Sequence, residues 1–323
     1  MRTERLAACV VLAAASGVAV AQSAPADYPN RPIRFVVAAA PGGSSDGASR
    51  VIGVKLTERW GQQVVIDNRG GAGGIIGAQT VAQSAPDGYT IGMVSIRHSV
   101  NPSLLSVPFD AVKDFTQITM TAEVGNVLVV NAKSTLTSVK DIIAQAKEKP
   151  GALTFASSGI GGAPHLTGEF FALQTGVKLT HIAYKGGGPA VADLVAGAVT
   201  MSFASMTSAV PHIRSGRLRA LAVASKDRSA LLPEVPTMKE AGVPNVQVRD
   251  WQGVIAPKGL SKGLTDKLST TIRAALKDPE MQPRLAAMGL DVIASTPEEF
   301  RRTIEEDVKR WAVVVKQANI KAD

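Results

Sequence analysis

The segment that decides the fold runs from residue 33 to residue 46 and reads IRFVVAAA followed by PGGSSD. Residues 33–40 are almost continuously apolar, which is typical of a strand that is buried on both faces of a sheet. Residues 41–46 contain Pro, Gly and Ser, which favour a tight turn and the start of a helix. Val51, Ile52 and Leu56 then repeat on one stripe, so the segment predicts a strand, a turn and an amphipathic helix.

The same order recurs along the chain. Further apolar runs lie at residues 64–66, 90–95, 127–130, 153–156, 179–184, 199–203 and 218–224. Helical patterns separate many of these runs; one opens at Ser138 and Asp141, which resemble a capping box. Alternation of strands and helices is the signature of doubly wound sheets. The sequence therefore predicts an α/β protein of two lobes, each with a mainly parallel doubly wound sheet.

The last part of the chain differs. Residues 248–256 predict one more strand, and residues 265–275, 279–288 and 297–317 predict helices. A terminal amphipathic helix cannot bury its apolar stripe alone, so we expect this segment to pack back across an earlier lobe. We predict one lobe from residues 27–125 and 250–323, a second from residues 126–249, and a ligand cleft between them, with the two crossings as a hinge.

Composition excludes several classes of protein. The 323 residues are 45% hydrophobic and 19% charged, which excludes disorder and coiled coils and allows real cores. The single cysteine, Cys9, excludes a disulfide framework and a cysteine-based metal site. The net charge of +8 is dispersed and only 4% of residues are aromatic, so small anions are better partners than nucleic acid.

The first residues have the pattern of an export signal. Arg2 and Arg5 begin it, residues 6–20 are almost wholly apolar, and residues 19–21 form an A-x-A cleavage site. The apolar stretch is too short for a membrane span of about 20 residues. Cys9 has the letters of a lipoprotein box before it, but no apolar region precedes them, so we assign Cys9 to the signal. We predict residues 1–21 to be cleaved near Ala21 and the mature protein to be periplasmic.

Three turns that precede helices are rich in Gly and Ser, at residues 41–46, 157–165 and 185–189. Ligands of parallel α/β sheets bind beyond the carboxyl ends of strands, where helix N-termini offer unpaired N–H groups and partial positive charge. A single such turn is more simply explained as a turn with a helix cap. Three of them in two lobes favour a site for a carboxylate, sulfate or phosphate.

The sequence lacks the usual signatures of enzymes and of metal sites. Residues 71–73 resemble a dinucleotide fingerprint, but Ile76 stands where the last glycine belongs. His98, His165, His181 and His212 lack the spacing of a zinc site. A secreted hydrolase that uses Ser158 and His165 is a competing interpretation, although no acid orients His165 within the motif and no nucleophile elbow is present. We expect no catalytic activity, no cofactor and no metal.

Short motifs along the whole mature chain then identify a family. They include Pro86-Asp87-Gly88-Tyr89-Thr90 and Pro233-Glu234-Val235-Pro236-Thr237, with others at residues 28–34, 40–46, 68–77, 113–115, 184–186, 218–223, 240–242, 251–253 and 256–257. Together they resemble the Bug family, the extracytoplasmic solute receptors of tripartite tricarboxylate transporters. The resemblance implies a periplasmic binding protein of type II, a two-lobe "Venus flytrap" that holds a carboxylate between its lobes and docks on membrane permease subunits.

The resemblance also implies ligand contacts in both lobes: Gly42, Gly43, Ser44, Ser45, Asp46, Gly71 and Ala72 in the first, and Ser157, Ser158, Gly161 and His165, with Lys185 and Gly186 nearby, in the second. Lys185 is either a partner for the anion or a solvated turn residue. Two features depart from the family pattern: the usual Pro before the first glycine turn is missing, and an acid after Phe203 is replaced. Ala204 and Ser205 replace an acid that often follows Phe203 in the family, which argues against an amino-acid ligand and leaves Ser205 at the site. Arg97 is unusual at its position, and either reads a distal carboxylate or faces solvent.

We therefore predict a periplasmic solute-binding protein for a small organic anion, either a di- or tricarboxylate or an aromatic carboxylate. We expect it to be a monomer that delivers the solute to the permease of a tripartite tricarboxylate transporter. A receptor that reports the solute to a signalling partner is the alternative, and the sequence does not separate the two because the physics of capture is the same.

Overall fold

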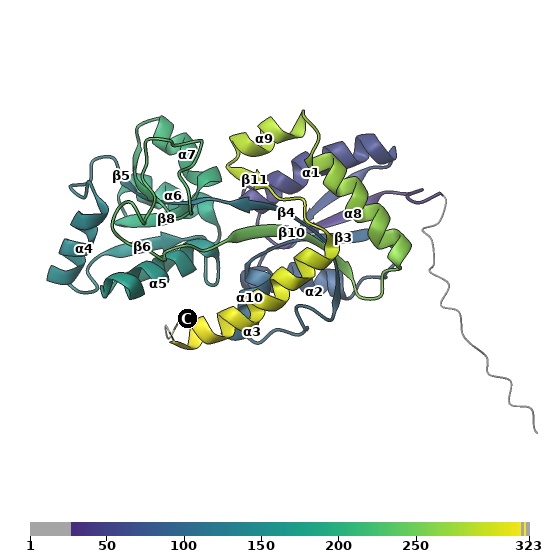
Figure 1. The fold of residues 1–323 in the computed structure, drawn as a ribbon, viewed down its shortest axis with the longest axis horizontal. Coiled ribbons are helices and arrows are strands. Elements are labelled where there is room, and N and C mark those ends of the chain that lie inside the picture. The colour runs from purple at the N-terminus through teal and green to yellow at the C-terminus, as the bar shows by residue number, and fades with distance from the viewer. Residues whose placement is uncertain (1–26, 318–319, 321–323) are drawn as a thin grey trace, which may run out of the picture.

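The computed structural model describes residues 27–317 and residue 320, so the predicted signal segment lies outside the described residues. Two units, each a β-sheet with helices on its faces, lie side by side along the long axis of the molecule (Figure 1). This arrangement confirms the predicted α/β protein of two lobes. Within residues 27–317 no helix has the length and apolar character needed to cross a bilayer.

The larger sheet has six strands, which are β1 (Ile33–Val37), β2 (Val64–Asn68), β3 (Thr90–Ser95), β4 (Phe115–Val124), β10 (Asp250–Pro257) and β11 (Leu290–Val292). Its helices are α1 (Ser44–Trp60), η1 (Ala72–Gly74), α2 (Ile75–Ala82), α3 (Arg97–Leu104), α8 (Lys262–Leu276), α9 (Met281–Ala287) and α10 (Pro297–Gln317). The smaller sheet has five strands, which are β5 (Asn126–Asn131), β6 (Thr154–Ser157), β7 (Thr180–Ala183), β8 (Met201–Ser205) and β9 (Leu218–Val223). Its helices are α4 (Val139–Glu148), α5 (Ala163–Thr175), α6 (Gly187–Ala196) and α7 (Met206–Arg214).

Both sheets are mixed, so the prediction of mainly parallel sheets is wrong. In the order β11-β4-β10-β3-β1-β2, only the pairs of β1 with β2 and β3 are parallel. In the order β7-β6-β8-β5-β9, β6 is parallel to β7 and β8, whereas β5 is antiparallel to β8 and β9. The reason is the route of the chain. β5 and β10 arrive from the other sheet and not through a helical crossover, which is the connection that enforces parallel pairing.

The chain passes between the sheets at two places. Gly125 separates β4 from β5, and the segment from residue 224 to residue 249 joins β9 to β10. Sequence patterns missed β4, β11, η1, α3 and α7. The predicted strands and the three predicted C-terminal helices lie within a few residues of their observed bounds.

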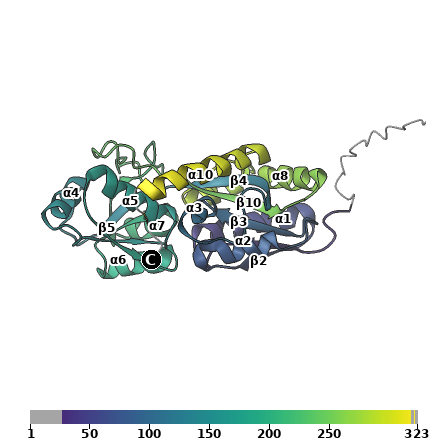
Figure 2. The ribbon, with the colours of Figure 1, turned by 90° about the horizontal axis from the view of Figure 1, so that it is seen from below.

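Hydrophobic cores cover both faces of the larger sheet. One lies under α1 and α8, and the other contains Trp251, Phe300 and Trp311 from β10 and α10. α10 lies across the molecule beside α3 and reaches towards α5 (Figure 2), where the Phe170 and Trp311 rings are 5.9 Å apart. The expectation that the C-terminal segment packs back on an earlier part of the chain is therefore confirmed. The smaller sheet is covered by α4 and α5 on one face and by α6 and α7 on the other.

Candidate functional site

Turns at the carboxyl ends of β1, β2 and β3 meet at one edge of the larger sheet because these strands are parallel neighbours. Glycines let the first two turns pack against each other. A Cβ atom at Gly70 would lie 2.9 Å from the backbone nitrogen of Ala40, and one at Gly74 would lie 2.8 Å from the carbonyl oxygen of Ala38. β1 ends at Val37, earlier than residue 40, because residues 38–40 form this contact instead of continuing the strand.

The first turn leads into α1 and contains five of the predicted site residues, Gly42, Gly43, Ser44, Ser45 and Asp46. Gly43 is the N-cap. Because it has no side chain, no capping side chain accepts hydrogen bonds from the first N–H groups of the helix. Gln252 of β10 donates its Nε2–H to Ser44 Oγ at 2.8 Å, which fixes the start of α1 against the sheet.

Asp46 shapes this turn. Its carboxylate accepts hydrogen bonds from the Gly42 backbone N–H at 2.9 Å and from Arg50 Nε at 3.1 Å. Burial alone raises the pKa of this carboxyl, but the hydrogen bonds from Arg50 and Gly42 outweigh it and lower the pKa. Asp46 is therefore ionised, and its Oδ2 is held by the protein's own donors, whereas Oδ1 is buried without a hydrogen bond and lies 3.0 Å from Arg50 Nη2. These contacts indicate a role in holding the turn.

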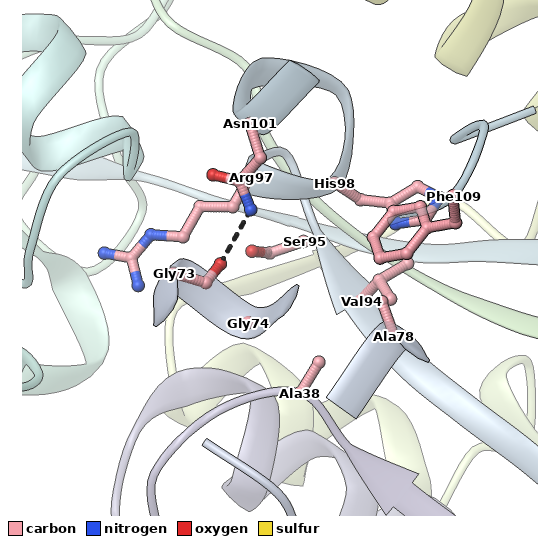
Figure 3. Close-up of a pocket in the computed structure, with 10 residues that line it drawn as sticks. All are labelled: Ala38, Gly73, Gly74, Ala78, Val94, Ser95, Arg97, His98, Asn101 and Phe109. Carbon is pink, nitrogen blue, oxygen red and sulfur yellow. Dashed lines mark hydrogen bonds between the residues drawn. The ribbon is translucent and has the colours of Figure 1, made fainter. Parts of the chain in front are cut away.

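The second turn, at η1, borders a small cavity of about 10 Å³, the size of one water molecule. Gly73, Ser95, Arg97 and Asn101 are among its lining residues (Figure 3). Asn101 Nδ2 donates to the Gly73 carbonyl oxygen at 3.1 Å and so ties α3 to η1. Gly71 and Ala72, the predicted contacts of this turn, are exposed.

The turn between β6 and α5 contains the predicted residues of the second lobe. Ser157 is fully buried, and its Oγ lies 2.7 Å from His181 Nε2 and accepts the Gly159 N–H at 3.1 Å. Ser158 is half-buried. Gly161 donates its backbone N–H to His165 Nδ1 at 3.2 Å.

His165 has a packing role in this turn. Its ring is 2% exposed and stacks on the ring of His181 with centroids 4.1 Å apart. Burial, with smaller contributions from His181 and Arg97, lowers the pKa of His165 to about 3, so the ring is neutral. The hydrolase interpretation required Ser158 and His165 to act together, whereas Ser158 Oγ accepts a hydrogen bond from Arg97 and His165 accepts one from Gly161.

Arg97, the first residue of α3, connects the two lobes. Its Nη2 donates to the Ser158 carbonyl oxygen at 2.8 Å, to Ser158 Oγ at 3.2 Å and to the Gly159 carbonyl oxygen at 3.2 Å. In Figure 3 its guanidinium points away from Val94 and Phe109 and out of the first lobe. The alternative that Arg97 faces solvent is therefore wrong.

The remaining predicted residues lie at the same edge of the smaller sheet. Ser205 ends β8, and its Oγ lies 2.6 Å from Ser208 Oγ. Gly186 is the N-cap of α6, and Lys185 beside it is exposed and makes no ion pair within the described part of the chain. No group of three or more potential metal-binding His, Cys, Asp or Glu side chains occurs among residues 27–317.

Sequence reasoning missed three contributors to the site. Gln252 holds α1 from a position 208 residues away, and Ser95 and Asn101 border the cavity. Gln252 lies in the predicted strand at residues 248–256, where a buried amide among apolar residues was the available signal. Ser95 and Asn101 carried no comparable signal.

Comparison with known proteins identifies the family. A model described as the tripartite tricarboxylate transporter family receptor matches residues 48–320. The chain belongs to this receptor family. The receptor is 41% identical to the protein BugT of Bordetella pertussis over 322 residues, which are 99% of this chain and 98% of BugT.

Two solved structures share the receptor's fold. The periplasmic binding protein BugD superposes with a TM-score of 0.85 at 34% identity, over 92% of this chain and 100% of that chain. A Rhodopseudomonas palustris protein with adipate, Rpa4515, superposes with a TM-score of 0.87 at 34% identity, over 91% of this chain and 99% of that chain. These matches confirm the family resemblance and the two-lobe binding-protein fold.

Proposed function

We propose that this receptor captures a small organic anion, a di- or tricarboxylate or an aromatic carboxylate, between its two lobes. In this proposal the first lobe consists of residues 27–125 and 250–323, and the second lobe consists of residues 126–249. The anion binds at the turns of residues 42–46 and 71–72 in one lobe and at Ser157, Ser158, Gly161, Gly186 and Ser205 in the other. Adipate in the related R. palustris protein supports this class of solute.

The observation that carries the proposal is the start of α1. This helix has 17 residues, and its N-cap lacks a side-chain partner for the first N–H groups. The positive end of the helix dipole and these N–H groups favour a carboxylate. The ion pair with Arg50, whose Nη2 lies 3.0 Å from Asp46 Oδ1, reduces the repulsion between Asp46 and the anion.

Capture proceeds by a shift of population. A carboxylate bound at α1 in the open form stabilises the closed form by the additional hydrogen bonds that the turn at residues 157–161 makes to it. Closure removes bulk water and strengthens these electrostatic contacts. The solute leaves unchanged, because the proposal requires neither a general base nor a nucleophile.

The cellular role follows from the family. We place the mature receptor in the periplasm, after cleavage of residues 1–21, as a monomer whose closed form docks on the permease subunits of a tripartite tricarboxylate transporter. The family's receptor role supports this assignment over a sensor that feeds a signalling partner. Uptake of the carboxylate by cells that express the permease constitutively, with and without the receptor, distinguishes the two, since a transport receptor is required for this uptake and a sensor is not.

A thermal-shift screen tests the solute class. The panel contains mono-, di- and tricarboxylates, aromatic acids, amino acids, sugars and cationic amines. We expect one carboxylate class to raise the melting temperature, whereas a response to sugars or cationic amines alone contradicts the proposal. Calorimetry with Ser158→Ala then measures the hydroxyl's part, expected to be about 1–3 kcal/mol of binding free energy. Ser215→Ala, a surface hydroxyl on α7's C-cap, is the matched control.

A further inference from the structure

Arg97 makes its contacts with the second lobe through protein groups alone. The three acceptors are the carbonyl oxygens of Ser158 and Gly159 and the hydroxyl of Ser158, at 2.8 to 3.2 Å from Nη2. Carbonyl oxygens are present whether or not a solute is bound. The contact therefore joins α3 of one lobe to the turn before α5 of the other without any help from a ligand.

The second lobe leaves room for the guanidinium by lacking side chains. A Cβ atom at Gly162 would lie 2.3 Å from Arg97 Nη2 and 2.9 Å from its Cζ, and one at Gly159 would lie 3.4 Å from Nη2. Gly162 has φ of −77° and ψ of 157°, which any residue adopts. Backbone conformation thus does not require glycine at position 162, whereas the space filled by Arg97 does.

The next turn of α3 continues the contact. A Cβ atom at Gly161 would lie 3.3 Å from Leu104 Cδ1 and 3.4 Å from Asn101 Oδ1. Asn101 is at the same time bonded to Gly73 of the first lobe's turn. Arg97, Asn101 and Leu104 therefore form one face of α3 that fits the glycine turn of residues 159–162.

We propose that Arg97 is an interlobe latch, in which its guanidinium, held by the carbonyls of Ser158 and Gly159, stabilises the closed receptor before any solute is bound. The latch deepens the proposed function. It rests on that function only for the predicted change in carboxylate affinity. Arg97 is in this role a positioning residue. It brings the turn of residues 157–161 to the solute and weakens the dependence of closure on the solute's own length and chemistry.

The latch predicts two measurable effects. Without solute, a substantial fraction of the receptor is closed, and loss of the latch opens it. With solute, loss of the latch lowers the affinity for every carboxylate by the same factor, about tenfold, because the charge-assisted hydrogen bonds are lost from the closed form only. A residue that bound a distal carboxylate group directly would instead change the relative affinities for monocarboxylates and dicarboxylates.

Pulsed electron spin resonance on the solute-free receptor tests the first effect. Spin labels at Lys140→Cys on α4 and Gln282→Cys on α9 report the distance between the lobes, and both positions are exposed. The chain's single cysteine, Cys9, lies in the predicted signal segment, so a mature protein carries these labels alone. Two variants are compared in this background. Arg97→Ala removes the guanidinium, and Gly162→Ala keeps the charge but displaces it from the turn.

We expect both variants to lose the short distance that the wild-type receptor shows, while Arg301→Ala, which removes an exposed arginine of α10, keeps it. Melting temperatures identify any variant that fails to fold, and the other variant then decides. An unchanged distance distribution in a folded Arg97→Ala or Gly162→Ala receptor overturns the latch. Because this measurement contains no solute, it stands even if carboxylates prove not to be the ligands.

Discussion

Asp250 is a buried acid whose ionisation opposes folding. It is the first residue of β10, at the return of the chain to the larger sheet, and is 9% exposed. Burial raises the pKa of this carboxyl to about 7, against a smaller opposing effect of Arg97 and with a further increase from Glu123. Asp250→Asn keeps the shape of the side chain and removes its titration.

The magnitude follows from the two pKa values. The interval from the ordinary value of 3.8 to about 7 corresponds to about 4 kcal/mol at about 1.4 kcal/mol per pH unit. The proton bound by folded Asp250 stabilises the protein fully below pH 3.8, and this stabilisation is lost as the pH rises through about 7. The advantage of Asp250→Asn over the wild type therefore grows by about 3 kcal/mol between about pH 4.5 and about pH 8.5.

Urea unfolding of both proteins across this pH range measures the effect. Groups that do not interact with Asp250 titrate equally in the two proteins and cancel in the difference of their unfolding free energies. Asp227→Asn, at an exposed acid of the segment after β9, is the control and is expected to show no such growth. A difference between Asp250→Asn and the wild type that stays constant with pH refutes the assignment of a raised pKa to Asp250.

Three further substitutions test a close backbone contact, a partly buried hydrogen bond and a helix cap. Gly77→Ala places a Cβ atom 2.6 Å from Ala38 Cα, so we expect a loss of about 1–3 kcal/mol in urea unfolding and weaker solute binding in calorimetry. Trp251→Phe removes the 2.6 Å hydrogen bond from Nε1 to Asp307 and is expected to cost about 1–3 kcal/mol; unchanged stability would show this bond to be dispensable. Ser138→Ala breaks the capping box of α4 and is expected to lower stability by about 1 kcal/mol without changing affinity, since α4 lies far from the site.

Strong local patterns explain how much of the fold could be predicted from the sequence. Residues 90–95 and 297–317 were predicted with the bounds of β3 and α10, because a buried apolar run and an amphipathic stripe are local signals. β4 was missed because Thr and Gln interrupt its apolar residues, although the strand is largely buried. The mixed pairing was missed because the direction of a strand depends on neighbours that are distant in the chain, as with β10 between β3 and β4.

The candidate site shows the same division. Gly and Ser marked the turns, because these residues permit close backbone approach and cap helices. The contacts that the side chains in those turns make with distant parts of the chain could not be predicted from the sequence. Arg97 meets Ser158 across 61 residues, and Gln252 meets Ser44 across 208. His165 looked like a ligand contact at a helix start, and only the stack with His181 places its ring in the interior.

A crystal structure of the receptor with its strongest-binding carboxylate tests the central claim most directly. We predict the intact solute with one carboxylate group within hydrogen-bond distance of the backbone N–H groups at the start of α1, and with the turn of residues 157–161 closed over it. A solute bound elsewhere, for example in the open groove beside β2 that Arg34, Val65 and Arg69 line, or a chemically converted product in the site, would contradict the account.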